Sequence, residues 1–287
     1  MKRLLVRIVV GLGFVAALLV VPVSEKASAE PVTPTKVLTI IEENHSYTQM
    51  KSQMPYLFTL AQKYAYASNY FGVSHPSLPN YLAIAGGSTF GITDDRPPSI
   101  NAPKVGNAKT IFGLALEKGK TAKTYAESMP GTCALFSSGT YAVKHNPWAY
   151  FSAGRSRCSK FAVPMTGFLA DAKANNLPNA GVVVPNLCHD AHNCALSVAN
   201  AWLKKYLPTV LASADFTSGR LTVVVTADED DRSSGNKVLT VAMNAALDGK
   251  VVTTKLTHYS LCGYYSHVLG AHLLGRSIAG FSTAFGL

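Results

Sequence analysis

Four consecutive carboxylates at residues 228–231 are the densest group of reactive side chains in the sequence. They follow residues 220–227, an apolar and β-branched run typical of a strand buried on both faces of a parallel sheet. Adjacent negative charges repel one another unless water or a cation screens them. Ligands of open α/β sheets bind just beyond the carboxyl ends of such strands. The run therefore predicts a metal site, with a solvated acidic loop or a calcium-stabilised turn as the alternatives.

Three further polar clusters follow predicted strands in the same way. They are Glu43 and Asn44 after residues 36–41, Ser77 and Asn80 after residues 65–71, and Asp190 and His192 after residues 181–185. The carboxyl ends of parallel neighbours meet at one edge of a sheet. If these strands are parallel neighbours, we expect all four clusters to converge there.

Ser77 is the candidate nucleophile. It lies between His75 and Asn80, before a helix predicted at residues 81–85. We expect it at the helix cap, where free N–H groups and the helix dipole favour an anion. A metal that coordinates its hydroxyl would lower the hydroxyl pKa, and Asn80 could donate to a phosphoryl oxygen. An ordinary helix-capping serine is the alternative.

The histidines give weaker signals. Asp190 and His192 are two residues apart in a tight turn, so their side chains can point to one place. A local cap beside a surface histidine is the alternative. His145 and His258 are each weak candidates by themselves.

All five cysteines lie beyond the first 29 residues. We pair Cys188 with Cys194, which are close in sequence, and Cys133 with Cys158, which bracket a long loop. Cys262 is then left over, and we expect it to be buried in a helix. This cysteine usage is typical of an exported protein, in which disulfides persist.

Residues 1–29 have the pattern of a secretory signal peptide. A basic start precedes an apolar middle, and Ala27-Ser28-Ala29 forms a cleavage signal. An uncleaved anchor is the alternative, but the apolar run is shorter than the roughly 20 residues that span a bilayer. Residues 30–287 suit a single domain. We expect a secreted protein without stable membrane insertion; no feature of the sequence indicates an oligomeric state.

The chain is basic, with a formal net charge of +10. This charge would attract anionic substrates or surfaces. The lysines are scattered, however, and no basic stripe with interleaved aromatic residues is present. We therefore do not expect nucleic acid to be a primary partner.

Strand and helix patterns alternate along the chain. We predict strands at residues 36–41, 65–71, 121–125, 181–185, 220–227 and 238–243. We predict helices at residues 55–63, 81–85, 110–118, 161–175, 195–211 and 260–274, and loops at residues 91–107 and 129–160. This alternation predicts an α/β fold with a largely parallel sheet and helices on both faces.

Six motifs occur in an order that resembles a known family. They are Glu42-Glu-Asn-His-Ser46, His75-Pro-Ser-Leu-Pro-Asn-Tyr81, Lys144-His-Asn-Pro-Trp148, Pro185-Asn-Leu-Cys-His-Asp-Ala-His192, Asp228-Glu-Asp-Asp231 and Thr257-His-Tyr259. The set resembles the bacterial phosphoesterases that include secreted acid phosphatases and phospholipases C, within the alkaline-phosphatase-like superfamily. Ala227 and Arg232 depart from the family, which commonly has Trp and Gly there.

The resemblance implies a metal-dependent phosphohydrolase with a phosphoserine intermediate on Ser77. The implied metal ligands are Glu43, Asn44, Ser77, Asp228 and Glu229. The implied pocket residues for phosphate contact and leaving-group protonation are His145, Asp190, His192 and His258. Oxygen ligands suit Mg, Ca or Mn, and the nearby histidines leave Zn or Fe open.

We therefore expect a secreted, acid-phosphatase-like enzyme that hydrolyses phosphate monoesters. Its substrates would be small-molecule or lipid-headgroup phosphoesters. A phosphodiesterase or phospholipase C that uses the same site is the first alternative. A catalytically silent secreted protein that binds phosphate or a surface is the second.

Overall fold

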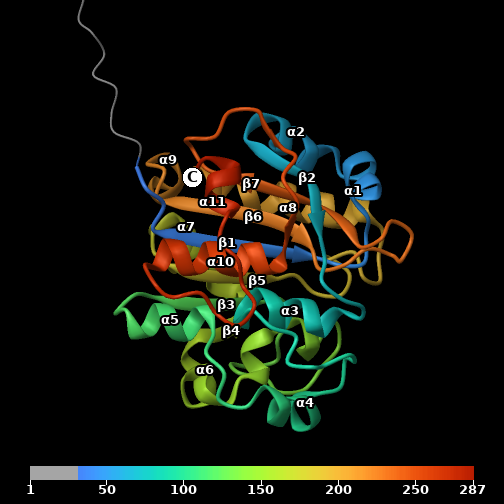
Figure 1. The fold of residues 1–287 in the computed structure, drawn as a ribbon, viewed down its shortest axis with the longest axis vertical. Coiled ribbons are helices and arrows are strands. Elements are labelled where there is room, and N and C mark those ends of the chain that lie inside the picture. Colours follow the sequence, from blue (N-terminus) through green and yellow to red (C-terminus); the bar gives the residue numbers. More distant parts are fainter. Residues whose placement is uncertain (1–31) are drawn as a thin grey trace, which may run out of the picture. The chain divides into compact units, whose positions relative to one another are not determined.

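The computed structural model describes residues 32–287, through which one nine-stranded sheet runs (Figure 1). The predicted signal peptide lies outside the described residues. The strands are β1 (Lys36–Glu42), β2 (Ala65–Phe71), β3 (Ala122–Ala126), β4 (Ala162–Pro164), β5 (Ala180–Val184), β6 (Leu221–Ala227), β7 (Lys237–Met243), β8 (Lys250–Val252) and β9 (Leu256–Thr257). Their order is β4-β3-β5-β1-β6-β7-β2-β8, and β9 pairs with β2.

The strand directions bring the predicted clusters to one edge of the sheet. β7 runs antiparallel to both of its neighbours, β6 and β2, whereas the other pairings are parallel. β1, β2, β5 and β6 consequently all point the same way. The predicted largely parallel sheet is confirmed, although β7 separates β2 from the other three strands.

β1 and β6 form the centre of the sheet. Every residue of β6 is buried, as is every residue of β1 except the partly exposed Lys36. Burial on both faces explains why these strands are nearly continuous apolar runs. Their register pairs Glu42 with Ala227, so the first residues beyond the two strands, Glu43 and Asp228, lie next to each other.

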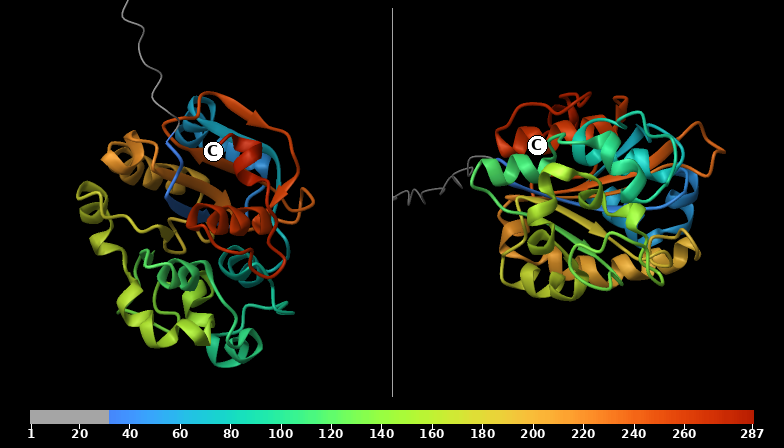
Figure 2. Two further views of the ribbon diagram at one scale, coloured as in Figure 1. Left: turned by 60° about the vertical axis from the view of Figure 1, so that its left-hand side comes forward. Right: turned by 90° about the horizontal axis from the view of Figure 1, so that it is seen from below.

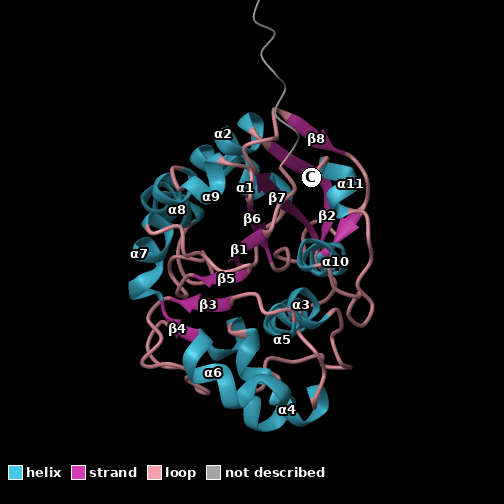
Figure 3. Ribbon diagram, turned by 90° about the vertical axis from the view of Figure 1, so that its left-hand side faces the viewer, coloured by secondary structure: helices cyan, strands magenta, loops and turns pink. Residues whose placement is uncertain are grey.

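Helices cover both faces of the sheet, as predicted (Figures 2 and 3). One layer contains α3 (Ser77–Gly86), α5 (Ile111–Glu117), α10 (His258–Leu269) and α11 (Phe281–Phe285). The other contains α1 (Tyr47–Gln53), α2 (Pro55–Lys63), α7 (Phe168–Lys173), α8 (Leu196–Leu211) and α9 (Ala214–Thr217). The two remaining helices, α4 (Pro98–Val105) and α6 (Arg155–Phe161), pack near 3-10 turns within residues 143–154.

Four segments differ from their predictions. The predicted loop at residues 129–160 contains three 3-10 turns and most of α6. The predicted loop at residues 91–107 contains α4, which begins with Pro98, and proline fits a first turn because its missing N–H would have no helical partner. The predicted helix at residues 161–175 begins instead with β4, an edge strand that can tolerate Pro164. The closing helix stops at Leu269 because Gly270 adopts a left-handed conformation.

The cysteine predictions are confirmed. Disulfides join Cys133 to Cys158 and Cys188 to Cys194, and the free Cys262 is buried in α10. Among the described residues, no helix is long and apolar enough to cross a membrane.

Candidate active site

Glu43 lies at the centre of the site, one residue beyond β1. Its backbone N–H donates to the carbonyl oxygen of Asp190 at 2.8 Å. On the opposite side, the backbone N–H of Asp228 donates to the carbonyl oxygen of Glu42 at 3.0 Å. The bond to Asp228 extends the pairing of β1 with β6, and the bond to Asp190 joins the loop after β5 to the residue beyond β1. They therefore hold the loops after both strands against Glu43.

Ser77 reaches the Glu43 carboxylate from the first position of α3, and it is only 2% exposed. The prediction that Ser77 caps the helix is wrong, because Pro76 is the N-cap residue. The Ser77 hydroxyl donates to Oε2 of Glu43 at 3.0 Å, and Nζ of Lys144 lies 3.4 Å from the same hydroxyl oxygen. Tyr81, one turn later, donates to Oε1 of Glu43 at 2.6 Å. The serine hydroxyl thus lies between a carboxylate and a cation.

Asp228 and Glu229 lie beside Glu43 at the end of β6. Oδ1 of Asp228 accepts the backbone N–H groups of Asn44 at 3.1 Å and of Glu229 at 2.7 Å. The buried Oδ2 of Asp228 has no hydrogen-bond partner among the described residues. Oε2 of Glu229 accepts a hydrogen bond from Nδ2 of Asn80 at 3.0 Å. Asn80 therefore orients a carboxylate of the site.

These acids fit a divalent cation. Burial, and to a smaller extent the charge of Asp190, raises the pKa of Glu43 well above its usual range. Burial, and to a smaller extent the charge of Glu43, also raises the pKa of Asp228 well above its usual range. Burial and the charge of Asp228 raise the pKa of Glu229 to about 9. A cation bound here would offset the crowded negative charges, and the unpartnered Asp228 oxygen would be one of its ligands. The oxygen-rich donor set is one that hard divalent cations prefer.

The other two acids of the run have different surroundings. Oδ1 of Asp230 accepts the backbone N–H of Arg232 at 2.8 Å, and its Oδ2 accepts those of Ser234 at 2.6 Å and Asn236 at 3.0 Å. These backbone donors stabilise the turn. Asp231 is exposed. The run therefore divides into two acids at the site, one acid that holds the loop and one acid in solvent.

His145 and His192 border Glu43 on its other side. Nε2 of the buried His145 lies 3.1 Å from Oε1 of Glu43, and its Nδ1 lies 3.2 Å from Oδ2 of Asp190. The His145 ring stacks on Tyr81, with 5.1 Å between ring centroids. One ligand atom each from Glu43, His145 and His192 lie within 4.8 Å of one another, so this group could also hold a metal ion.

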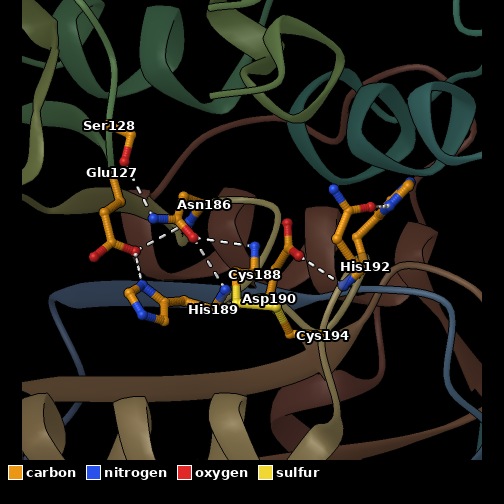
Figure 4. The surroundings of a disulfide bond; sticks show 9 residues. Glu127, Ser128, Asn186, Cys188, His189, Asp190, His192 and Cys194 are labelled. Carbon is orange, nitrogen blue, oxygen red and sulfur yellow. Dashed lines mark hydrogen bonds and ion pairs between the residues drawn. A yellow bond between two sulfur atoms is a disulfide. The ribbon is translucent and has the colours of Figure 1, made fainter. Parts of the chain in front are cut away.

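The Cys188–Cys194 disulfide closes the loop that carries Asp190 and His192 (Figure 4). Within this loop, Oδ1 of Asp190 accepts the backbone N–H of His192 at 2.8 Å. His189 points away from them towards Glu127, with 2.8 Å between its Nδ1 and Oε2 of that residue. The loop thus directs only its second histidine towards the site.

His258 has surroundings that the sequence did not indicate. It is fully buried, its Nε2 lies 2.5 Å from the carbonyl oxygen of Asp228, and its Nδ1 lies 3.1 Å from the hydroxyl of Tyr70. The short contact to a carbonyl oxygen requires a proton on Nε2. Burial lowers the pKa of His258 to about 4. Its position supports the backbone behind Asp228 rather than a phosphate contact.

Comparison with known proteins identifies the family. Residues 42–234 match the Phosphoesterase family. The chain belongs to this family. The phosphatidylinositol-3-phosphatase of Mycobacterium tuberculosis is 32% identical over 247 residues, which cover 85% of this chain and 79% of that protein.

A fungal relative agrees with this assignment, and a solved structure has a similar fold. The phosphate-repressible acid phosphatase of Penicillium chrysogenum is 35% identical over 236 residues, which cover 77% of this chain and 55% of that protein. The chain thus spans about half the length of the fungal enzyme. A Vibrio parahaemolyticus protein of the alkaline phosphatase superfamily shares the fold, with a TM-score of 0.60, 13% identity, and coverage of 88% of this chain and 70% of that chain. The predicted family and fold are confirmed, and this phosphoesterase belongs among the hydrolases of phosphoric esters.

Lys144 and Asp95 are two site residues of this phosphoesterase that the sequence did not single out. Oδ2 of Asp95 accepts a hydrogen bond from Nζ of Lys144 at 2.9 Å, and Oδ1 accepts the backbone N–H of Leu78 at 2.9 Å. Asp95 therefore holds the cation beside Ser77 and also binds the first turn of α3. Lys144 is the first residue of one of the six motifs, so the sequence could have indicated that it belongs to the site. Asp95 lies in a predicted loop without any pattern.

We expect the metal-free phosphoesterase to lose stability as the pH rises, in part because of Asp190. Burial raises the pKa of Asp190 to about 7. A carboxyl whose folded pKa exceeds its unfolded value binds more protons in the folded state. Its stabilisation is therefore complete below the unfolded pKa of about 4 and is lost as the pH rises through about 7. Melting temperatures measured in chelator should fall over this range.

Asp190→Asn tests this pH dependence. The amide oxygen can still accept the N–H of His192, but the side chain no longer titrates. The melting temperature of the variant should depend less on pH than that of the wild type between about pH 4 and pH 7. Equal slopes for the two proteins would contradict the role assigned to Asp190.

Proposed function

We propose that this chain hydrolyses phosphate monoesters and that Ser77 is the nucleophile. The observation that carries the proposal is the position of the Ser77 hydroxyl at the start of α3, 3.0 Å from Oε2 of Glu43 and 3.4 Å from Nζ of Lys144. A carboxylate can accept the serine proton, and a cation can bind a phosphoryl oxygen. The relatives named as phosphatases support the same reaction class.

One divalent cation would be held by the five predicted ligands, Glu43, Asn44, Ser77, Asp228 and Glu229. When bound, it supplies positive charge that lowers the pKa of the serine hydroxyl and offsets charge on the phosphoryl oxygens. The oxygen donors suit Mg, Ca or Mn, while His145 and His192 leave Zn and Fe open. Asn80, which donates to Glu229, positions this ligand.

The chain's own residues carry the reaction in two steps. In the first, Glu43 accepts the Ser77 proton, Oγ forms a bond to phosphorus, and the bond from phosphorus to the leaving oxygen breaks. His192, whose Nε2 lies 3.4 Å from Nζ of Lys144, protonates the leaving oxygen. Lys144 binds a phosphoryl oxygen. In the second step, His192 accepts a proton from water as the water oxygen bonds to phosphorus, the bond from phosphorus to Oγ breaks, and Glu43 returns its proton to Ser77. Phosphate is released and Ser77 is restored.

We further propose that the protein is secreted after cleavage near Ala29. Two disulfides support export, because disulfides persist in oxidising compartments. The substrates would then be small-molecule or lipid-headgroup phosphoesters outside the cell. Detection of mature protein that begins at Glu30 in the culture medium would support this proposal.

A comparison of p-nitrophenyl phosphate with bis-p-nitrophenyl phosphate tests the function. We expect the purified protein, supplied with divalent metal, to release p-nitrophenol from the monoester with at least about tenfold higher kcat/KM. Faster cleavage of the diester would favour the phosphodiesterase alternative. Release from neither compound, with every metal tried, would favour a catalytically silent binding protein.

A further inference from the structure

An open cleft of about 470 Å³ has Lys144 in its lining and continues along an apolar wall. Its polar end contains Asp95, Lys144 and His192. Lys144 joins this end to the nucleophile, since its Nζ lies 3.4 Å from Oγ of Ser77. A phosphoryl group at Ser77 would therefore direct its ester substituent into this space, which we call the Phe136 cleft.

The wall of the Phe136 cleft is built from apolar side chains, namely Pro97, Phe136, Ala142, Val143 and Leu187. Phe136 is 63% exposed, the highest value among the large exposed hydrophobic residues of the described chain. An exposed aromatic ring leaves apolar surface in water that a ligand could cover. Aromatic side chains commonly line ligand pockets that also contain a few polar groups.

The backbone around Phe136 is anchored, so the ring is presented by a constrained loop. Cys133, three residues earlier, is bonded to Cys158. Directly after Phe136, the Oγ of Ser137 accepts the backbone N–H of Val143 at 3.0 Å. A surface that is ordered before binding loses less entropy when a ligand arrives.

We propose that the Phe136 cleft selects phosphate monoesters with an aromatic leaving group and that Phe136 is the residue that determines this specificity. This inference rests on the proposed function, because it requires the phosphoryl group to lie at Ser77. The apolar wall offers an aromatic leaving group a surface for stacking. A sugar or glycerol would instead place its hydroxyl groups against side chains that cannot form hydrogen bonds with them.

Phe136→Ala and Phe136→Trp test the inference on the metal-loaded protein. For 1-naphthyl phosphate, Phe136→Ala should lower kcat/KM by about fivefold or more, mainly through KM, because it removes a stacking contact. For glycerol 2-phosphate, kcat/KM should stay within about twofold, and Phe136→Trp should retain the preference for the aromatic ester. Ile278→Ala is the matched control, because it truncates a 48% exposed apolar side chain outside the cleft. It should leave kcat/KM unchanged for both substrates.

Inhibition gives a second readout that reports binding rather than the chemical step. The inhibition constant of phenylphosphonate should rise in Phe136→Ala, while that of inorganic phosphate should not. Suppose that the wild type hydrolyses both esters. If Phe136→Ala then lowers kcat/KM equally for the two esters, or for neither of them, the inference is overturned and the proposed function stands. If the wild type releases phosphate from neither ester, the proposed function fails and the inference fails with it.

Discussion

Ser77→Ala is expected to lower kcat for p-nitrophenyl phosphate by about a thousandfold or more, because it removes the atom that attacks phosphorus. The hydroxyl of Ser77 is buried between Glu43 and Lys144. The smaller side chain should fit the same space without altering α3. Initial rates and melting temperature would be measured together, so that a loss of activity is separated from a loss of fold.

Ser74→Ala is the matched control for this variant. The Ser74 hydroxyl lies on the same loop but donates only to the carbonyl oxygen of His75, at 3.2 Å. Its removal should leave kcat within about twofold of the wild type. In acid-quenched wild type, the peptide that contains Ser77 should carry one phosphoryl group. Wild-type rates in Ser77→Ala would exclude Ser77 as the nucleophile.

Removal of metal with a chelator is expected to abolish phosphate release, and one divalent cation should restore it. Glu43, Asp228 and Glu229 are crowded carboxyls that need a positive charge to remain ionised together. Asp228→Asn removes a proposed ligand and should weaken metal affinity by at least about tenfold. Calorimetric titration of metal into the chelated protein measures this change.

The stability of metal-free Asp228→Asn gives a test that is independent of turnover. The variant replaces a buried carboxyl, which burial and the charge of Glu43 make costly to ionise, with a neutral amide. Without metal it should therefore melt at or above the temperature of the wild type near neutral pH. With metal, the wild type should gain more stability than the variant. Asp231→Asn, in the exposed part of the same run, should behave like the wild type in both conditions. A metal-free Asp228→Asn that melts well below the wild type would show that Asp228 serves the fold.

Much of the architecture could be predicted because local patterns determine it. The apolar runs of β1 and β6 indicate central parallel strands, and the polar residues after them indicate the edge at which a site forms. The sequence spacing of Cys188 and Cys194 was enough to pair them. In each case, the signal lies within a few residues of the structure that it specifies.

The misses concern relations between distant segments. The buried, mostly apolar run of β7 does not encode the direction in which it pairs with β6 and β2, so its antiparallel orientation was not predictable. Lys144 and Asp95 form their ion pair across 49 positions of the chain. His258 follows a strand in the sequence, yet the start of α10 turns its ring behind Asp228. Tertiary packing decides each of these outcomes.

The position of β7 has a consequence for the order in which the sheet can be completed. β7 lies between β2 and β6 in the sheet, although it follows both in the chain. The strand that leads to Ser77 is therefore joined to the strand that leads to Asp228 only through a segment made later than either. A nascent chain that has not yet emerged as far as Met243 lacks this connection. The edge of the sheet that carries Ser77 and Asp228 is therefore completed only after β7 has joined β2 to β6.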